Sequence, residues 1–211
     1  MLILAGFILS CNKNDNPSIP NIIHPDELSY YYLGEEIPLT KVKDKFYMAF
    51  YSKNEQILRS ELAKAGIDFP SVEEVKRYTD YSYDLIGSGS KIFKNYMCAV
   101  VENVDYEKVA SELTANTIYW APYYQTKDGY EVGLTEGLAV KLNPKTSIKQ
   151  ILTLLNKYSV EMMGADKYLP GWFMLVCTNR SKGNSLELAN IFYRSGLFEE
   201  TAPDFIVKLI Y

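Results

Sequence analysis

The chain carries few side chains whose types and spacing could form a catalytic centre. Its one histidine, His24, lies beside Pro25 in a polar segment that no predicted helix or strand holds in place. A Ser-His-Asp or Cys-His arrangement would need that imidazole on a rigid element. A zinc site of the usual kind needs several histidine or cysteine ligands gathered together. We therefore expect His24 to be solvated, and we expect no metal site.

Acidic residues and glycines offer no alternative centre. The acidic pairs are sequence neighbours, and neighbouring side chains diverge in strands and turns, so paired acid and base carboxylates are disfavoured. These pairs are Glu35-Glu36, Glu73-Glu74 and Glu199-Glu200. The stretch "GSGS" at residues 87–90 lacks a lysine and a following helix start that would direct a dipole at phosphate, so we interpret it as a loop. The sequence predicts a protein that is not an enzyme and uses no cofactor.

Composition is that of a globular protein. Of the 211 residues, 47% are hydrophobic and 23% charged, which is ordinary for a folded chain of one large or two small domains. The net charge of −4 supplies no basic field, which disfavours binding to nucleic acid. The 18 tyrosines suit half-exposed sheet faces and interfaces, because the ring is apolar while the hydroxyl stays hydrated.

The N-terminus has the features of an export signal. The first ten residues, "MLILAGFILS", carry no charge and are too few to span a bilayer, which takes about 20 apolar residues. The stretch "ILSC" resembles the lipobox of bacterial lipoproteins, although an n-region with Lys or Arg is missing and Leu9 occupies a position that is often small. The resemblance implies a signal peptide over residues 1–10, lipidation of Cys11, and a protein exported and anchored in the bacterial cell envelope.

The alternative for this segment is a buried apolar strand with an incidental cysteine. Residues 11–28 are polar and contain proline, which predicts a flexible tether between the anchor and the folded part. Cys98 and Cys177 each lie inside an apolar run, so we expect buried structural thiols, with a disulfide between them as the alternative in an oxidising compartment.

The second half of the chain, residues 127–211, predicts the order β-α-β-β-α-β. Strands are expected over residues 137–142, 160–164, 171–177 and 204–211, the last entered through Ala202-Pro203. Ser147 and Gln150 predict a capping box for the first helix, and Asn184 with Glu187 caps the second, which Gly196 ends. The apolar stripe expected on the first helix consists of Ile148, Ile151, Leu152 and Leu155.

The first half, residues 29–126, predicts the same order. Strands are expected over residues 45–51, near 77–83, over 95–101 and over 117–124, the last containing Ala121-Pro122. Ser52 is expected to cap a helix that buries Leu58, Leu62 and Ala65 and ends at Gly66, and residues 105–116 form the second helix. Gly34 marks a hairpin before this half, and Asp128-Gly129 marks another between the halves.

Two such units predict an α+β fold of two tandem ferredoxin-like (βαββαβ) plaits. Each antiparallel sheet would carry both helices on one face and leave the other face free for a partner. The alternative is one continuous α+β domain whose halves are alike by coincidence.

Three segments together resemble the N-terminal prodomain of bacterial subtilisin-like serine proteases, in its fervidolysin-type form. They are "YYYLGEEIPLT", "DGYEVGLTEGLAVKL" and "YLPGWFMLVCTNRSKGNSLELANIFYRSGLFEETAPDF". The resemblance covers most of residues 30–205 and is sharpest over residues 160–205. It implies a plait that lays its open sheet face on the protease as inhibitor and folding chaperone, while the segment after the last strand enters the active-site cleft.

The resemblance places the protease-binding tail on the last eight residues: Asp204, Phe205, Ile206, Val207, Lys208, Leu209, Ile210 and Tyr211. In the family a catalytic domain with Asp, His and Ser follows the prodomain, and that domain is not among these 211 residues. We therefore expect an orphan prodomain that acts on a separate protease, with an interaction module that lost its protease or the remnant of an interrupted gene as the alternatives. A last core strand without any inhibitory role is the plainer interpretation of the same tail.

An unrelated binding module of the cell envelope, for protein or glycan, is the alternative function. Its candidate residues are the aromatic ones at Tyr30, Tyr31, Tyr32, Tyr119, Trp120, Tyr123 and Tyr124. Most of these are expected to pack against neighbours in the core. Aromatic side chains lining a concave groove would favour this alternative.

Overall fold

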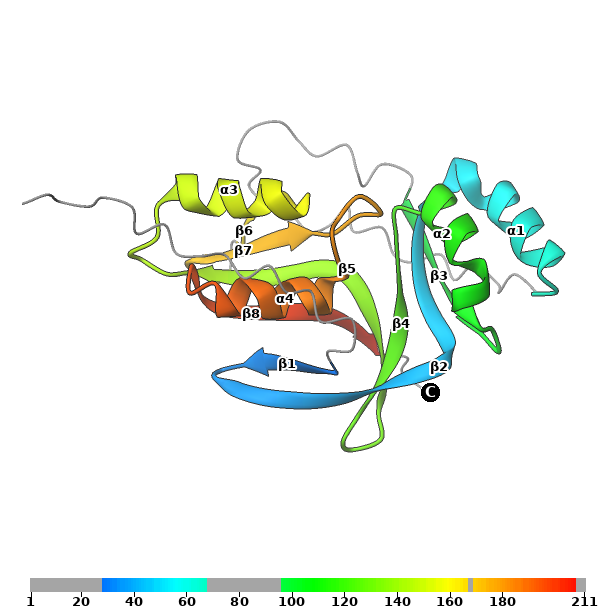
Figure 1. The fold of residues 1–211 in the computed structure, drawn as a ribbon, viewed down its shortest axis with the longest axis horizontal. Coiled ribbons are helices and arrows are strands. Elements are labelled where there is room, and N and C mark those ends of the chain that lie inside the picture. The colour runs from blue at the N-terminus through cyan, green and yellow to red at the C-terminus, as the bar shows by residue number, and fades with distance from the viewer. Residues whose placement is uncertain (1–27, 68–95, 167–168, 208–211) are drawn as a thin grey trace, which may run out of the picture.

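The protein has an α+β fold, as predicted. In a computed structural model of the chain, residues 28–67, 96–166 and 169–207 are described (Figure 1). The strands are β1 (Ser29–Tyr32), β2 (Glu35–Tyr51), β3 (Tyr96–Glu102), β4 (Tyr119–Thr126), β5 (Glu131–Leu142), β6 (Glu161–Ala165), β7 (Trp172–Val176) and β8 (Phe198–Val207). The α-helices are α1 (Glu55–Lys64), α2 (Ala110–Asn116), α3 (Ile148–Tyr158) and α4 (Ser185–Arg194).

All strand pairs described in the sheet are antiparallel, and each half of the chain has its own strand order. In the first half β2 lies between β3 and β4. In the second half the order is β6-β7-β5-β8. Figure 1 shows α1 and α2 beside the first set of strands, at the opposite end of the molecule from α3. Strand β4 also pairs with the beginning of β5, so the two sets of strands are continuous.

Both predicted hairpins are present. Leu33 and Gly34 have φ values of 50° and 79°, which are the left-handed values that a two-residue turn between β1 and β2 requires. Gly129 has a φ of 85° in the turn between β4 and β5. The turn between β6 and β7 contains Gly171 with a φ of 82°, after Pro170 as predicted.

Strand β2 is much longer than the predicted strand over residues 45–51. It runs for 17 residues, so the second strand of the N-terminal hairpin and the first strand of the first half are one element. Its register against β4 shifts between Lys41 and Phe46. Within this irregularity Lys45 binds Glu102 of β3 and Glu131 of β5, with N–O distances of 3.0 and 2.7 Å. A bulge of this kind bends a strand without ending it.

The two Ala-Pro pairs lie inside strands and do not open them. Strand β8 begins at Phe198, so the prediction that it is entered through Ala202-Pro203 was wrong. Pro122 of β4 is opposite Phe46, beside the register shift in β2. Pro203 of β8 is opposite Leu138, beside a register shift between Leu134 and Leu138 of β5. Proline lacks an N–H donor, and it is tolerated in a sheet where the ladder is already irregular.

Helix ends follow the predicted signals in the second half more closely than in the first. The capping boxes of Ser147 with Gln150 and of Asn184 with Glu187 are both formed. Gly66 and Gly196 follow their helices with φ values of 76° and 70°, as predicted. Ser52, however, does not cap α1: it begins a short 3-10 turn, and Asn54 is the N-cap, without a side-chain hydrogen bond.

The predicted apolar stripes were partly wrong. Helix α3 buries Ile151, Leu154, Leu155 and Tyr158, whereas Ile148 and Leu152 are 57% and 47% exposed. The buried positions have the same spacing as the predicted stripe but begin at Ile151, because the Tyr158 ring packs edge-on to Phe192 of α4 and orients the helix. On α1, Leu58 and Leu62 are buried as predicted, but Ala65 is exposed.

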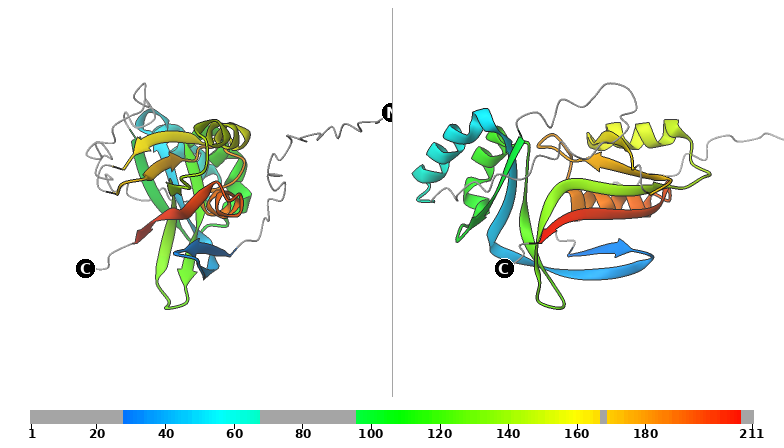
Figure 2. Two further views of the ribbon diagram at one scale, coloured as in Figure 1. Left: turned by 90° about the vertical axis from the view of Figure 1, so that its left-hand side faces the viewer. Right: turned by 180° about the vertical axis from the view of Figure 1, so that it is seen from behind.

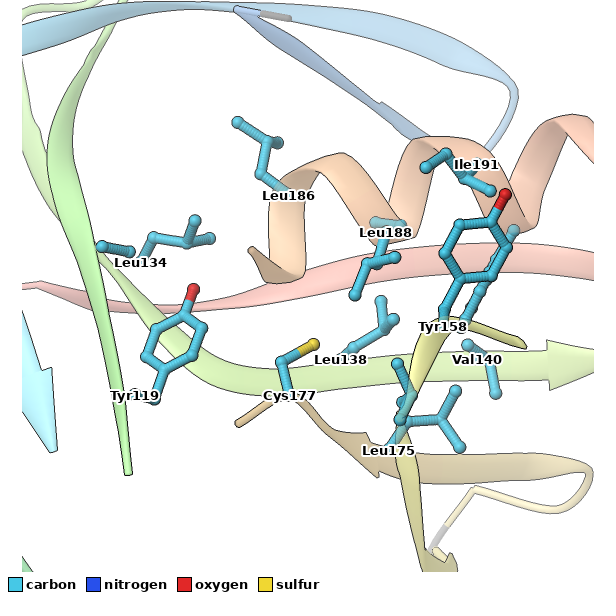
Figure 3. Close-up of a cluster of buried hydrophobic side chains, with 14 of the residues drawn as sticks. Tyr119, Leu134, Leu138, Val140, Tyr158, Leu175, Cys177, Leu186, Leu188 and Ile191 are labelled. Carbon is cyan, nitrogen blue, oxygen red and sulfur yellow. The ribbon is translucent and has the colours of Figure 1, made fainter. Parts of the chain in front are cut away.

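Two clusters of buried side chains hold these elements together. The smaller one joins α1 and α2 to one face of the first sheet, through residues such as Phe46, Leu58 and Leu113. The larger one contains side chains from both halves, among them Tyr119, Leu134, Leu138, Cys177 and Leu188, which lie close together in Figure 3.

The face of the first sheet opposite α1 and α2 belongs to this larger cluster. Tyr47, Ala49 and Cys98 lie on that face and are at most 3% exposed. The expectation that this sheet keeps a free outer face was therefore wrong, because the second half packs against it. The two halves share one core.

Leu155→Ala is expected to lower the free energy of unfolding by about 2–5 kcal/mol, because it removes a buried side chain and leaves a cavity. Leu152→Ala, on the same helix but half-exposed, is the matched control and is expected to change it by no more than about 0.5 kcal/mol. Urea unfolding followed by circular dichroism measures both values. Equal losses for the two variants would contradict the orientation of α3.

Candidate functional site

Several predicted sites lie outside the described residues. These are the signal peptide over residues 1–10, Cys11, most of the tether over residues 11–28 with His24, the second strand near residues 77–83, residues 87–90 and the pair Glu73-Glu74. The last four residues of the predicted tail, Lys208, Leu209, Ile210 and Tyr211, also lie outside them. Their roles stay predictions.

The other half of the predicted tail is part of the sheet. Asp204, Phe205, Ile206 and Val207 are the last residues of β8, and Phe205, Ile206 and Val207 pair with β5. The Phe205 ring lies 5.3 Å from the ring of Tyr30. A Cβ atom on Gly133 would come within 2.7 Å of Ile206 Cγ2, so the β5 backbone at this glycine is tightly covered by the Ile206 side chain.

The two described cysteines are buried free thiols, as predicted, and the alternative disulfide is not formed. Burial raises the pKa of Cys177, and the negative charges of Glu136 and Glu187 raise it further. This thiol therefore stays protonated in the folded protein, which makes it a poor nucleophile.

The aromatic residues named for the alternative function fall into three groups. Tyr30 and Tyr31 pack on Phe205 and Tyr193, with centroid distances of 5.3 and 4.6 Å, and Tyr32 is 48% exposed. Tyr123 is buried in the large cluster. The third group, Tyr119, Trp120 and Tyr124, lines a cavity.

This cavity has a volume of about 350 Å³ and lies where the halves meet. Its walls come from Leu28, from β2 and β4, from the last turn of α2, from the β7–α4 loop (residues 177–184) and from the start of α4. The lining residues are Leu28, Lys41, Thr114, Tyr119, Trp120, Pro122, Tyr124, Thr178, Asn179, Ser181, Gly183, Asn184 and Glu187. Pockets of about 300–1,000 Å³ are typical of small-molecule sites.

Hydrogen bonds fix the β7–α4 loop to both halves. The side-chain amide of Asn179 donates to the carbonyl oxygens of Thr114 and Thr117, at 3.0 and 2.9 Å. The Ser181 hydroxyl donates to the Ser159 carbonyl oxygen at 2.8 Å. The loop is therefore held between the end of α2 and the end of α3, and the cavity wall that it forms is preorganised.

Polar side chains also bind the start of α4 to the strands beneath it. The Ser185 hydroxyl donates to the Thr135 carbonyl oxygen at 2.6 Å, and the Ser185 N–H donates to the Tyr119 hydroxyl at 3.2 Å. The hydroxyl of Tyr47, from the first half, donates to Glu136 at 3.0 Å. These bonds are buried, where hydrogen bonds are needed to offset desolvation.

The electrostatics of the cavity keep its two tyrosines neutral. Burial raises the pKa of Tyr119 well above its usual value. Burial also raises the pKa of Tyr124, and the charge of Glu187 adds to this effect, while a hydrogen bond with Asn184 opposes it. Both hydroxyl groups are therefore protonated near neutral pH and can donate as well as accept hydrogen bonds.

Among the described residues, no group of three or more His, Cys, Asp or Glu side chains lies close enough to hold a metal ion. Within the same part of the chain, none of the helices combines the length and apolar character needed to cross a membrane.

No protein-family model matches the chain, and no curated protein matches it either.

Sequence reasoning missed the polar half of the cavity, notably Thr114, Asn179 and Ser181. The run "TNRSKGNS" before α4 showed a polar loop and a cap. The sequence held no signal that this loop packs against α2 and β4, which are more than fifty residues earlier in the chain.

Raised pKa values predict that the protein loses stability in alkaline solution. Cys177, Tyr119 and Tyr124 stay protonated when folded but ionise in the unfolded chain, near pH 8.5 for the thiol and about 10 for the phenols. Their stabilisation is complete below about pH 8.5. Above it, the free energy of unfolding falls by up to about 1.4 kcal/mol per pH unit for each ionising group.

Urea unfolding at a series of pH values from 7 to 11 measures this slope. Cys177→Ala should flatten it between about pH 8.5 and 10. The same slope in the Cys177→Ala variant would contradict the assignment.

Proposed function

We propose that the protein is a non-catalytic, prodomain-like module that binds a subtilisin-like serine protease, as inhibitor or as folding chaperone. The proposal combines the resemblance of residues 30–205 with one structural observation: a partly exposed sheet face on the second half. It includes a lipid anchor on Cys11, which would hold the module in the bacterial cell envelope.

Tandem ferredoxin-like plaits, with a boundary between residues 126 and 127, are part of the proposal. Strand order supports them, because the second half has β6-β7-β5-β8, in which the first strand of the unit lies between its third and fourth. In the first half β2, likewise the first strand, lies between β3 and β4. In each half the last strand contains a proline that lies beside a register shift in the first strand. These prolines are Pro122 of β4, beside the shift in β2, and Pro203 of β8, beside the shift in β5.

The outer face of the second sheet is the surface that would contact the protease. Leu138, Val140 and Leu175 point to the helices and are completely buried. The residues that alternate with them are partly exposed, and we name them the outer face: Ala139, Lys141, Trp172, Met174, Glu200 and Ala202.

Pairing brings the members of this face together. Met174 and Ala202 flank Ala139, and Trp172 and Glu200 flank Lys141. The face therefore combines an aromatic and a thioether side chain with small residues and a polar margin. Interfaces between proteins typically have such an apolar centre and a polar rim.

The tail contributes differently from the sequence-based expectation. Its residues up to Val207 belong to β8, so an extended segment that enters an active-site cleft would begin at Lys208. Such a segment would bind by adding a strand to the edge of the protease sheet, with alternate side chains in pockets. The strand up to Val207 would set the direction in which that segment leaves the module.

Inhibition of purified subtilisin-like proteases, beginning with the one encoded nearest to this chain, tests the proposal. We expect slow, tight inhibition of peptide hydrolysis, which Trp172→Asp and Met174→Asp each weaken about tenfold or more, since both place a charge in the centre of the contact. Ile148→Asp is the matched control, because Ile148 is exposed on α3, on the helical side of the sheet.

Circular dichroism establishes that each variant is folded. Loss of inhibition in the Ile148→Asp variant alone would contradict the choice of face. A protein that neither inhibits any of these proteases nor accelerates their refolding would refute the function.

A further inference from the structure

The cavity between the halves has no part in the proposed contact with a protease. None of the residues that line it belongs to the outer face. It is formed by the first half through β2, β4 and α2, and by the second half through the β7–α4 loop and the start of α4. A preorganised cavity that exists only because two halves pack together is a candidate ligand site.

We propose that this cavity binds a sugar residue of an uncharged glycan. The inference is independent of protease binding. It rests on the three properties of the cavity that a ligand would meet: its aromatic surface, its neutral hydrogen-bonding groups, and its balance of charge.

Aromatic surface is the first property. Trp120 is half-buried, and its indole N–H donates to the Thr114 hydroxyl at 3.3 Å, which fixes the plane of the ring. Tyr124 lies four residues further along the same strand and also lines the cavity. A pyranose ring has an apolar face formed by C–H groups, and such a face packs on the face of an aromatic ring. The fixed indole offers that contact without an entropic cost for ordering it.

Neutral hydrogen-bonding groups are the second property. Uncharged polar side chains lie around the aromatic residues. They are the amides of Asn179 and Asn184 and the hydroxyl groups of Thr114, Thr178 and Ser181. The Asn179 amide and the Ser181 hydroxyl already donate their hydrogens within the protein, so their oxygen atoms would meet the hydroxyl groups of a sugar as acceptors. They come from α2, the β7–α4 loop and the N-cap of α4, so they surround a ligand from several sides.

Balanced charge is the third property. The two ionisable side chains with full charges that line the cavity are Lys41 and Glu187, of opposite sign. The Lys41 ammonium lies 3.9 Å from the Glu107 carboxylate, and the Glu187 carboxylate accepts a hydrogen bond from the Asn184 N–H at 2.8 Å. The cavity has no excess positive charge among its lining side chains to bind a phosphate or a free carboxylate. A neutral polyhydroxylated ligand fits better.

Tryptophan fluorescence tests the inference directly, because the chain has two tryptophans, Trp120 and Trp172. In the Trp172→Phe variant Trp120 is the sole reporter. We would titrate this variant with chitotetraose, cellotetraose, maltotetraose and mannotetraose, which are all uncharged, and with N-acetylphenylalanine amide as a probe for peptide side chains. We expect saturable quenching by at least one of the oligosaccharides.

Variants locate the binding. Trp120→Ala should weaken the affinity for that oligosaccharide about tenfold or more, measured by calorimetry. Tyr130→Ala, at a 67% exposed tyrosine in the β4–β5 hairpin, is the matched control and should bind like the unaltered protein. The indole N–H resonances of the unaltered protein give a second readout that needs no variant: the Trp120 signal should shift with sugar, and the Trp172 signal should not.

Three results would overturn the inference. One is the absence of saturable binding for every oligosaccharide, and another is saturable binding of the phenylalanine amide alone, which would make the cavity a peptide site. The third is a sugar-dependent shift of the Trp172 resonance without a shift of Trp120. Protease inhibition that persists in the Trp120→Ala variant would leave the proposed function standing whatever the outcome here.

Discussion

Strand β5 pairs with β4 and then with β7 along one edge, while β8 covers its other edge. The positions of the remaining elements depend on this arrangement. Since β4 belongs to the first half and β7 to the second, β5 determines how the two sets of strands meet. Buried side chains then fill the junction, with Tyr47 of the first half bonded to Glu136 of β5 itself. Figure 2 shows β5 and β8 running together from this junction.

Local signals predicted local structure well. The turns at Gly34 and Gly129 formed at the predicted positions. So did both capping boxes of the second half and the glycine ends of α1 and α4. These features depend mainly on a few adjacent residues and their backbone angles. The cap expected at Ser52 is the exception, because Asn54 is the N-cap of α1. The buried thiols were predicted for a similar reason, because each lies inside an apolar run.

Features decided by distant contacts were predicted less well. Leu152 has the spacing of a buried residue, but the side of α3 that faces the sheet is set by Tyr158 packing on Phe192. The face of the first sheet with Tyr47 and Ala49 was expected to be free, and only the position of the second half reveals that it is buried. The cavity also depends on distant contacts. Nothing in the sequence around Trp120 or Asn179 indicates a site, because the packing of the two halves brings these residues together.

The contacts of β1 bear on how the chain folds. This strand is near the beginning of the described chain, yet the Asn190 side-chain amide of α4 donates to the Ser29 carbonyl oxygen at 2.7 Å, and Tyr30 packs on Phe205. During synthesis on the ribosome, these partners of β1 emerge only after nearly all of the described chain has been made. The hairpin of β1 with β2 can form early because it is local, whereas the docking of β1 on α4 and β8 follows the folding of the second half.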